Sequence, residues 1–212
     1  MLIRLLKNWY KVLLSVFGPR KCAGCGQIAE EGLLCGVCRA ALRQPLWLPA
    51  RDALDGAGML FRYSGALKTA LQKVKFGSRR EILELLAEEY CQFSAADWPG
   101  TLRGILHRRA VIIVPIPTAR QRVKARGFDI PLVLFEKSGA GHCLTPALAR
   151  TRETLPQYDL RPLERRLNLE GCFAVTQNVA GKTVVVVDDI FTTGATMEEA
   201  AKALKAAGAA EV

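Results

Sequence analysis

The sequence predicts an α/β fold in which a mostly parallel sheet is flanked by helices. Two β-branched runs, Val111–Val114 and Thr183–Val187, are typical of strands buried on both faces of a parallel sheet. Segments with helical spacing of apolar residues precede and follow these runs. Half of the 212 residues (50%) are hydrophobic, which excludes a disordered chain and provides material for a core.

The predicted elements follow one another in two domains, residues 1–45 and residues 46–212. An amphipathic helix over Met1–Phe17 begins the first domain, and its interspersed cations exclude a signal peptide. An extended connector around Pro45 and Pro49 marks the boundary. The second domain then has, in order, a strand, two helices, the two buried strands and a last helix: Ala57–Tyr63, Leu67–Phe76, Arg80–Phe93, Val111–Val114, Thr183–Val187 and Met197–Ala207.

The last residues, Gly208–Val212, have the pattern of a helix stop that leads into another strand. Either the sequence stops short of the protein's end or the sheet ends early, and the residues leave both alternatives open. No run of roughly 18 apolar residues occurs, so we expect no transmembrane segment and a cytoplasmic location.

Four of the seven cysteines fall in two tight pairs, Cys22/Cys25 and Cys35/Cys38. Four thiolates are the ligands that Zn²⁺ takes in closed structural sites, and the nine-residue spacer is long enough for a hairpin that joins the pairs. The alternative is a thioredoxin-like redox pair, but such a pair belongs between a strand and a helix of a βαβ unit. We therefore predict a zinc-ribbon-like module whose metal stabilises the fold and does not catalyse.

A second predicted site follows the run Thr183–Val187. Asp188 and Asp189 come first, and a hydroxyl-rich turn comes next: Thr192, Thr193, Gly194, Ala195 and Thr196. Because ligands of open α/β sheets bind at the carboxyl ends of the strands, the turn suits a phosphate and the acids suit ribose hydroxyls, with Mg²⁺ near a second phosphate. The alternative is a helix cap beside a solvated acidic loop. We predict a site for a phosphorylated sugar.

A basic segment follows the other run, at the same predicted edge of the sheet. After Pro117 and Thr118 come four cations, namely Arg120, Arg122, Lys124 and Arg126, which suit a pyrophosphate. The alternative is a solvated basic loop. Further along, the polar and basic stretch from Arg150 to Asn168 is typical of a mobile flap over a site. Its candidate residues are Arg152, Thr154, Gln157, Arg166 and Asn168.

These motifs together resemble the ComF family of competence proteins (ComFC/GntX-type). The resemblance rests on an ordered set: the four cysteines, Lys75-Phe76-Gly77, Val114–Pro117, Arg122-x-x-x-Arg126-Gly127-Phe128, Arg152-x-Thr154-x-x-Gln157, Arg166-x-Asn168-x-x-Gly171-x-Phe173 and Val184–Thr196. The last of these resembles the phosphoribosyl pyrophosphate (PRPP) motif of type I phosphoribosyltransferases. One departure is that Gly127-Phe128-Asp129-Ile130 stands where the family usually has Gly-Phe-Asn-Gln.

The resemblance implies a type I phosphoribosyltransferase fold with an N-terminal zinc module. It implies that Asp188 and Asp189 hold the ribose hydroxyls of PRPP and that Thr192–Thr196 hold its 5′-phosphate. The loop after Pro117 would take the pyrophosphate, with Thr118, Arg122 and Arg126. It also implies a role in natural transformation and single-stranded DNA uptake, with a helicase-like partner and no firmly assigned reaction.

Two functions therefore stay open at the level of sequence. One is a DNA-handling protein with PRPP as ligand or regulator, which the formal net charge of +10 favours because nucleic acids are polyanions. The other is a transferase that moves phosphoribosyl from PRPP to a nitrogen acceptor, with Mg²⁺ on the leaving pyrophosphate. A pure zinc-bearing scaffold is a third possibility, but it leaves the acid–threonine segment unexplained.

Overall fold

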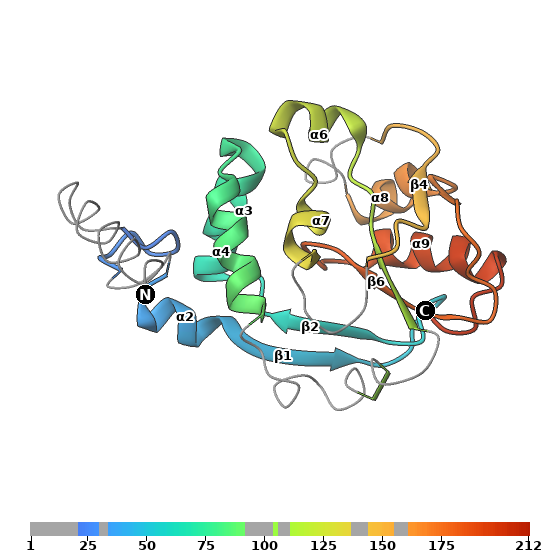
Figure 1. Cartoon of the computed structure of the whole chain (residues 1–212), viewed down its shortest axis with the longest axis horizontal. Helices are drawn as coiled ribbons and strands as arrows, with labels where there is room; N and C mark the ends of the chain where they lie inside the picture. The colour runs from blue at the N-terminus through green and yellow to red at the C-terminus, as the bar shows by residue number, and fades with distance from the viewer. Residues whose placement is uncertain (1–20, 30–33, 92–103, 106–110, 137–143, 155–160) are drawn as a thin grey trace, which may run out of the picture.

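In the computed structural model of the chain, the described residues are 21–29, 34–91, 104–105, 111–136, 144–154 and 161–212 (Figure 1). The amphipathic helix expected over Met1–Phe17 lies outside them, as do the last two residues of the helix expected over Arg80–Phe93. Within the described part of the chain, no helix combines the length and the hydropathy that crossing a membrane requires.

A parallel sheet lies at the centre of the fold. Strand β3 (Val111–Pro115) pairs in parallel with β6 (Thr183–Val187), so that Val111 lies opposite Thr183 and Pro115 opposite Val187. Single parallel bridges extend this sheet on both sides, at Leu144 beside β3 and at Glu211 beside β6. The two buried runs are thus parallel neighbours, and the loops that follow them leave the same edge of the sheet.

Two antiparallel strand pairs accompany the parallel sheet. Strand β1 (Arg43–Leu48) pairs with β2 (Ala57–Phe61), and β4 (Leu148–Arg150) pairs with β5 (Phe173–Val175). The expected connector around Pro45 is therefore a strand, and its register shifts between Arg43 and Leu46, where proline has no N–H to donate. The boundary predicted between residues 45 and 46 falls inside β1, and the division into domains stays a prediction.

The expected helices are present: α3 (Gly65–Gly77), α4 (Arg80–Cys91) and α9 (Ala195–Ala206). Two segments that the sequence predicts to be loops are helical: α6 (Arg120–Arg126) and α8 (Pro162–Leu169). Their arginine, lysine, leucine and glutamine residues are good helix formers, and the abundance of charge concealed that propensity. Two short helices complete the described set, α2 (Gly36–Leu42) and α7 (Ile130–Phe135).

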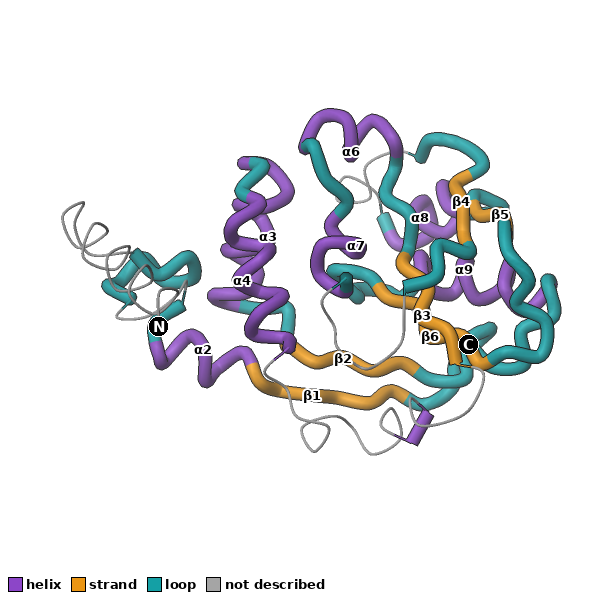
Figure 2. Tube along the Cα trace, viewed as in Figure 1, coloured by secondary structure: helices purple, strands orange, loops and turns teal. Residues whose placement is uncertain are grey.

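Two hydrophobic cores lie on either side of the sheet edge. One joins β3 and β6 to α9 and to the β4–β5 pair, with Val114, Val184 and Leu204 among its most buried residues. The other joins the cysteine-rich segment to α3, α4 and α7. Figure 2 shows α3 and α4 on one side of the molecule and α8, α9, β4 and β5 on the other. The cysteine-rich segment is therefore packed into a core that it shares with the rest of the chain.

Candidate functional site

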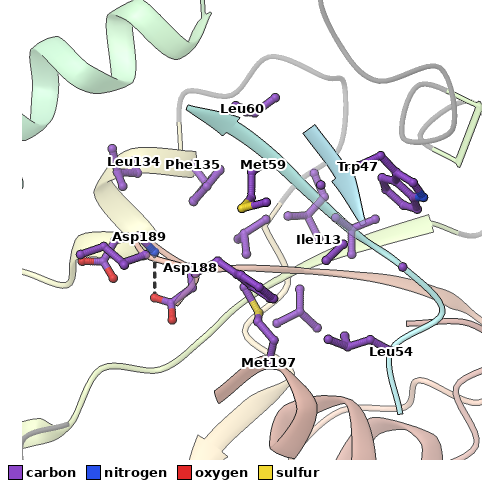
Figure 3. A pocket seen from close by; sticks show the side chains of 18 of the residues that line it. Trp47, Leu54, Met59, Leu60, Ile113, Leu134, Phe135, Asp188, Asp189 and Met197 are labelled. Carbon is purple, nitrogen blue, oxygen red and sulfur yellow. Dashed lines mark hydrogen bonds between the residues drawn. The ribbon is translucent and has the colours of Figure 1, made fainter. Parts of the chain in front are cut away.

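The two acidic residues lie directly after β6, at the edge of the sheet. The Asp189 side chain is only 10% exposed, and its Oδ2 lies 2.7 Å from Nζ of Lys75 on α3. The backbone N–H of Asp189 donates to Oδ1 of Asp188 over 2.8 Å (Figure 3). Burial and the charge of Asp189 raise the pKa of Asp188 well above its ordinary value. The two carboxyl groups thus differ: Asp189 has the Lys75 cation beside it, whereas Asp188 holds its proton more tightly.

The hydroxyl-rich turn leads into the first turn of α9. Gly194 is the N-cap and has a φ of 85°, in the left-handed region. A Cβ at this position would lie 2.9 Å from the Phe191 ring, so both the backbone and the packing require glycine. The backbone N–H of Ala195 donates to Oγ1 of Thr193 over 3.4 Å. Hydroxyls at the start of a 12-residue helix suit an anion.

An arginine from the distant β1–β2 connection holds this turn in place. Nε of Arg51 donates to Oε1 of Glu198 over 2.8 Å, and Nη2 donates to the carbonyl oxygen of Thr193 over 2.7 Å. Glu198 is 4% exposed, so Arg51 provides the charge that its burial requires. Arg51 thus holds the backbone at Thr193 and the side chain of Glu198 in the first turn of α9, on opposite sides of Gly194.

The basic segment forms α6, which ends at Arg126. Burial lowers the pKa of Arg126, and the charge of Arg122 lowers it further, whereas the charges of Asp189 and Asp129 oppose this shift. Its guanidinium carbon lies 5.9 Å from the centroid of the Phe128 ring. Nε of Arg126 is buried and has no hydrogen-bond acceptor among the described residues. The structure therefore places an arginine with an unused donor within electrostatic range of Asp189.

The carboxylate of Asp129 binds Thr118, which lies just before α6. Oδ2 of Asp129 accepts the backbone N–H of Thr118 over 3.1 Å, and Oδ1 accepts its hydroxyl over 3.0 Å. Asp129 is the residue that departs from the usual family pattern, and the structure gives it a definite contact.

A second partly buried arginine, Arg150, links the base of the predicted flap to this loop. Nε of Arg150 donates to the carbonyl oxygen of Pro117 over 2.7 Å, and Nη1 donates to Oγ1 of Thr154 over 2.9 Å. Its guanidinium carbon lies 5.1 Å from the centroid of the Phe173 ring. Burial lowers the pKa of Arg150, while the charge of Asp188 acts in the opposite direction. Arg150 thus connects the loop at Pro117, the predicted flap at Thr154 and strand β5 at Phe173.

The other flap candidates have different surroundings. Nη2 of Arg152 donates to the carbonyl oxygen of Glu170 over 2.9 Å, on the exposed surface. The backbone of Arg166 and Asn168 belongs to α8, and Gln157 lies outside the described residues. The flap therefore stays a prediction.

A cavity of about 350 Å³ opens beside the two acids, between β6 and the β1–β2 pair. Figure 3 shows Asp188 and Asp189 at one side of it and Trp47 and Leu54 toward the other. Most of its walls are apolar, and they include Met59, Phe135 and the side of β6. This opening explains why Val185, Val186 and Val187 of β6 are only partly buried, although the sequence predicted a strand covered on both faces; Val184 is buried as predicted.

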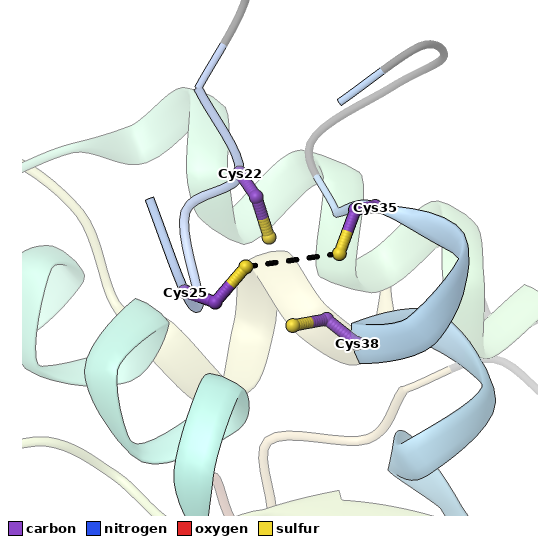
Figure 4. Close-up of side chains that lie close together, drawn as sticks. All are labelled: Cys22, Cys25, Cys35 and Cys38. Atoms are coloured by element: carbon purple, nitrogen blue, oxygen red, sulfur yellow. Dashed lines mark hydrogen bonds between the residues drawn. The ribbon is translucent and has the colours of Figure 1, made fainter. Parts of the chain in front are cut away.

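The four paired cysteines form a compact cluster near the N-terminal end of α2. Their sulfur atoms all lie within 4.8 Å of one another and point toward a common centre (Figure 4). Sγ of Cys25 lies 3.7 Å from Sγ of Cys35. Zn–S bonds of ~2.3 Å in a tetrahedron separate the sulfurs by about 3.8 Å, so the thiols have the spacing that zinc requires.

The protonation of these thiols also fits a metal. Burial opposes the ionisation of Cys22, but hydrogen bonds from the backbone of Cys25, Cys35 and Gly24 lower its pKa to about 6. Burial and the neighbouring thiols raise the pKa of Cys38 to about 12. A cation among the sulfurs would oppose the rise in the pKa of Cys38, because it favours the thiolate. Gly24 allows the first knuckle to lie against α3, because a Cβ there would be 2.2 Å from Cβ of Ala66.

Comparison with known proteins relates this geometry to a family. A family model described as "Phosphoribosyl transferase domain" matches residues 117–212, which contain both loops at the sheet edge. The competence protein ComFC of Bacillus subtilis (strain 168) is 27% identical over 198 residues, covering 89% of this chain and 73% of that protein. The DNA utilization protein YhgH of Escherichia coli (strain K12) is 30% identical over 202 residues, covering 90% of this chain and 80% of that protein. The chain belongs to the ComF family.

The ComF resemblance seen in the motifs is thus confirmed, and so is the phosphoribosyltransferase-type α/β fold with its N-terminal cysteine cluster. Competence protein F of Haemophilus influenzae (strain ATCC 51907 / DSM 11121 / KW20 / Rd) is a further relative, 26% identical over 202 residues, covering 90% of this chain and 86% of that protein. No solved structure matches the chain.

The matched phosphoribosyl transferase domain contains only part of the arrangement described above. Lys75, Arg51 and the four cysteines all precede residue 117. The sequence analysis quoted Lys75 in a motif without giving it a role, and it missed Arg51 entirely. The partners of Arg51 lie 142 and 147 residues away along the chain, and no local sequence pattern predicts such a contact.

Proposed function

We propose that this ComF protein binds PRPP at the carboxyl edge of its parallel sheet and serves DNA utilisation or competence. Asp188 and Asp189 accept hydrogen bonds from the ribose hydroxyls, and the turn Thr192–Thr196 holds the 5′-phosphate. Pro117, Thr118, Arg122 and Arg126 hold the pyrophosphate. The observation that carries the proposal is the contact of opposite charges across the edge, where Lys75 pairs with Asp189 and Arg126 lies in the field of the same carboxylate.

Two metal ions complete the proposal. Zn²⁺ would be held by Cys22, Cys25, Cys35 and Cys38, whose sulfur spacing and shifted pKa values fit a closed four-thiolate site. Mg²⁺ would arrive with PRPP, because a pyrophosphate beside two carboxylates needs a cation between them. Four free thiols in a metal site also suit a reducing compartment, which is why we propose a cytoplasmic location.

The DNA side of the proposal rests on relatives and on charge. The related proteins carry the names DNA utilization protein and competence protein. Thirty Lys and Arg residues against twenty Asp and Glu residues make the chain strongly basic, as single-stranded DNA binding requires. A helicase-like competence protein is the partner that we propose on the basis of the family resemblance.

A second candidate function is favoured by the cavity beside the acids. Its apolar walls include Tyr63 and Phe135 and reach Asp188 and Asp189. A flat nitrogen acceptor there would lie beside the ribose, so that its nitrogen forms a bond to C1 as the bond from C1 to the pyrophosphate oxygen breaks. Pyrophosphate release in the presence of individual nucleobases distinguishes this transferase from a protein that only binds PRPP.

Calorimetric titration with PRPP and Mg²⁺ tests the proposed site. The double variant Asp188→Asn/Asp189→Asn should bind PRPP and ribose 5-phosphate about 100-fold more weakly, because two hydrogen bonds to charged acceptors are weakened. Its affinity for inorganic pyrophosphate should not fall. Glu84→Gln/Glu88→Gln on α4 removes the same formal charge away from the site and should behave as the wild type. Equal PRPP affinity in all three proteins would refute the sugar-binding role.

A further inference from the structure

Asp129 already occupies two donors at the pyrophosphate side of the proposed site. Its two carboxylate oxygens accept the N–H and the hydroxyl of Thr118, over 3.1 Å and 3.0 Å. Thr118 follows Pro117, whose carbonyl oxygen is held by Arg150. The loop is therefore fixed from both sides, and its N–H and O–H donors point to a carboxylate of the same chain.

We propose that the Asp129 carboxylate is an internal anion that competes with pyrophosphate for Thr118 and sets the affinity of this side of the site. The inference rests on the proposed function, which assigns Thr118 to the pyrophosphate. A phosphate oxygen needs the same N–H and O–H donors that Asp129 uses. Two anions cannot share these donors at close range without a cation between them.

The charges around Arg126 support this reading. Asp129 and Asp189 both act on its guanidinium, and Arg122 is the cation that acts against them. Nε of Arg126 remains a buried donor without an acceptor among the described residues. The arginine is thus available to an incoming anion, but part of its field is cancelled by Asp129.

This arrangement defines the form of the ligand. A metal-free pyrophosphate meets the Asp129 charge directly, whereas a pyrophosphate that carries Mg²⁺ brings a compensating positive charge. The wild-type chain should therefore discriminate in favour of the magnesium complex, and the discrimination should depend on the charge of residue 129. If Asp129 only held Thr118 in place, the preference for the magnesium complex would not depend on the charge of residue 129.

Asp129→Asn separates charge from geometry. The asparagine carbonyl oxygen can accept the N–H of Thr118, as Oδ2 of Asp129 does, and its amide nitrogen can donate to the hydroxyl oxygen. The second hydrogen bond therefore reverses its direction, but the loop keeps both contacts. Calorimetry at low salt, with inorganic pyrophosphate as the probe, should show about tenfold tighter binding of the metal-free form to Asp129→Asn. The gain for the magnesium complex should be less than about threefold. Both gains should shrink as added salt screens the charges.

The control for net charge is Glu84→Gln on α4, which should leave both affinities unchanged. If thermal unfolding shows that Asp129→Asn is not folded, Asp129→Ser provides a second neutral variant that retains one hydroxyl near Thr118. Equal affinities in wild type and variant would overturn the inference while leaving the proposed function intact. Pyrophosphate binding that appears only in Asp129→Asn would support the inference and contradict the proposed function, and binding in neither protein would refute both.

Discussion

The cysteine cluster and the sheet-edge site are both sets of charged or ionisable groups, but they are built over different ranges of sequence. All four sulfurs come from residues 22–38, and their spacing identifies them before any fold is known. The edge site takes its groups from residues 51, 75, 118–129, 150–154 and 188–198. The cysteine cluster is therefore encoded in a short stretch of sequence, whereas the proposed phosphate site depends on the tertiary fold.

The two regions are also joined, because α3 contacts both. Nζ of Lys73 donates to the carbonyl oxygen of Ala23 in the first cysteine knuckle over 2.9 Å. Two residues later, Nζ of Lys75 lies 2.7 Å from Oδ2 of Asp189. The knuckle and α3 also share one hydrophobic core. We therefore expect that disruption of the cysteine cluster also disturbs the sheet-edge site, because α3 contacts both. Disruption of the sheet-edge site should leave a metal bound to the cysteines in place.

Loss of a buried cysteine of the proposed zinc site should have the largest effect. Cys38→Ala should remove zinc and lower the free energy of unfolding by more than about 3 kcal/mol, because structural zinc supplies folding energy directly. Metal content by mass spectrometry and denaturant unfolding measure both quantities. Cys172→Ala is the matched control, since Cys172 is also buried but lies outside the cluster, and it should keep its zinc. Full zinc content in Cys38→Ala would contradict the assignment of Cys38 to the proposed zinc site.

Loss of the arginine across the phosphate turn should have an intermediate effect. Arg51→Ala leaves Glu198 buried without its cation and frees one end of the turn, so it should cost about 2–3 kcal/mol of stability. Affinity for ribose 5-phosphate should fall about tenfold while affinity for pyrophosphate stays constant, because only the turn is loosened. Calorimetry with both ligands measures the difference.

Arg79→Ala is the control for a lost surface ion pair. Arg79 pairs with Glu81 on the exposed side of α4, and its removal should change stability by less than about 1 kcal/mol. Zinc content should stay the same in Arg51→Ala and Arg79→Ala. If Arg51→Ala weakened both ligands equally, the arginine would act on the whole fold and not on the turn.

The pH dependence of ligand binding should show the most specific effect, because it follows the titration of one carboxyl group. The pKa of Asp188 is raised, so the folded protein holds this proton over a range in which the unfolded chain has already lost it, and stability from this group falls as pH rises through that range. Ribose hydroxyls donate to the carboxylate, so affinity for ribose 5-phosphate should rise with pH by up to about tenfold per unit below the raised pKa.

The control in that experiment is Asp188→Asn, whose residual affinity for ribose 5-phosphate should stay constant over the same pH range. Pyrophosphate binding to the wild type corrects for protonation of the phosphate groups. A pH profile that is the same in wild type and Asp188→Asn would show that the titration of Asp188 does not control the sugar.

The sequence predicted those parts of the molecule that depend on neighbours along the chain. The valine run, the acids after it and the paired cysteines are contiguous signals, and the structure has each of them in the expected element. The α6 helix was misread as a loop because its cations obscured its helix propensity. The contacts of Arg51 and Arg150 could not be predicted, because a single polar residue does not indicate a partner 142 residues away, as for Arg51, or in a loop 33 residues away, as for Arg150.

A crystal structure of the chain with PRPP and Mg²⁺ tests the account most directly. We predict that the sugar oxygens lie within hydrogen-bond distance of Asp188 and Asp189, with the terminal phosphate seated on residues 192–196 and the diphosphate near Arg126. Electron density for the ligand on another surface, with the Lys75–Asp189 pair undisturbed and the turn empty, would contradict it.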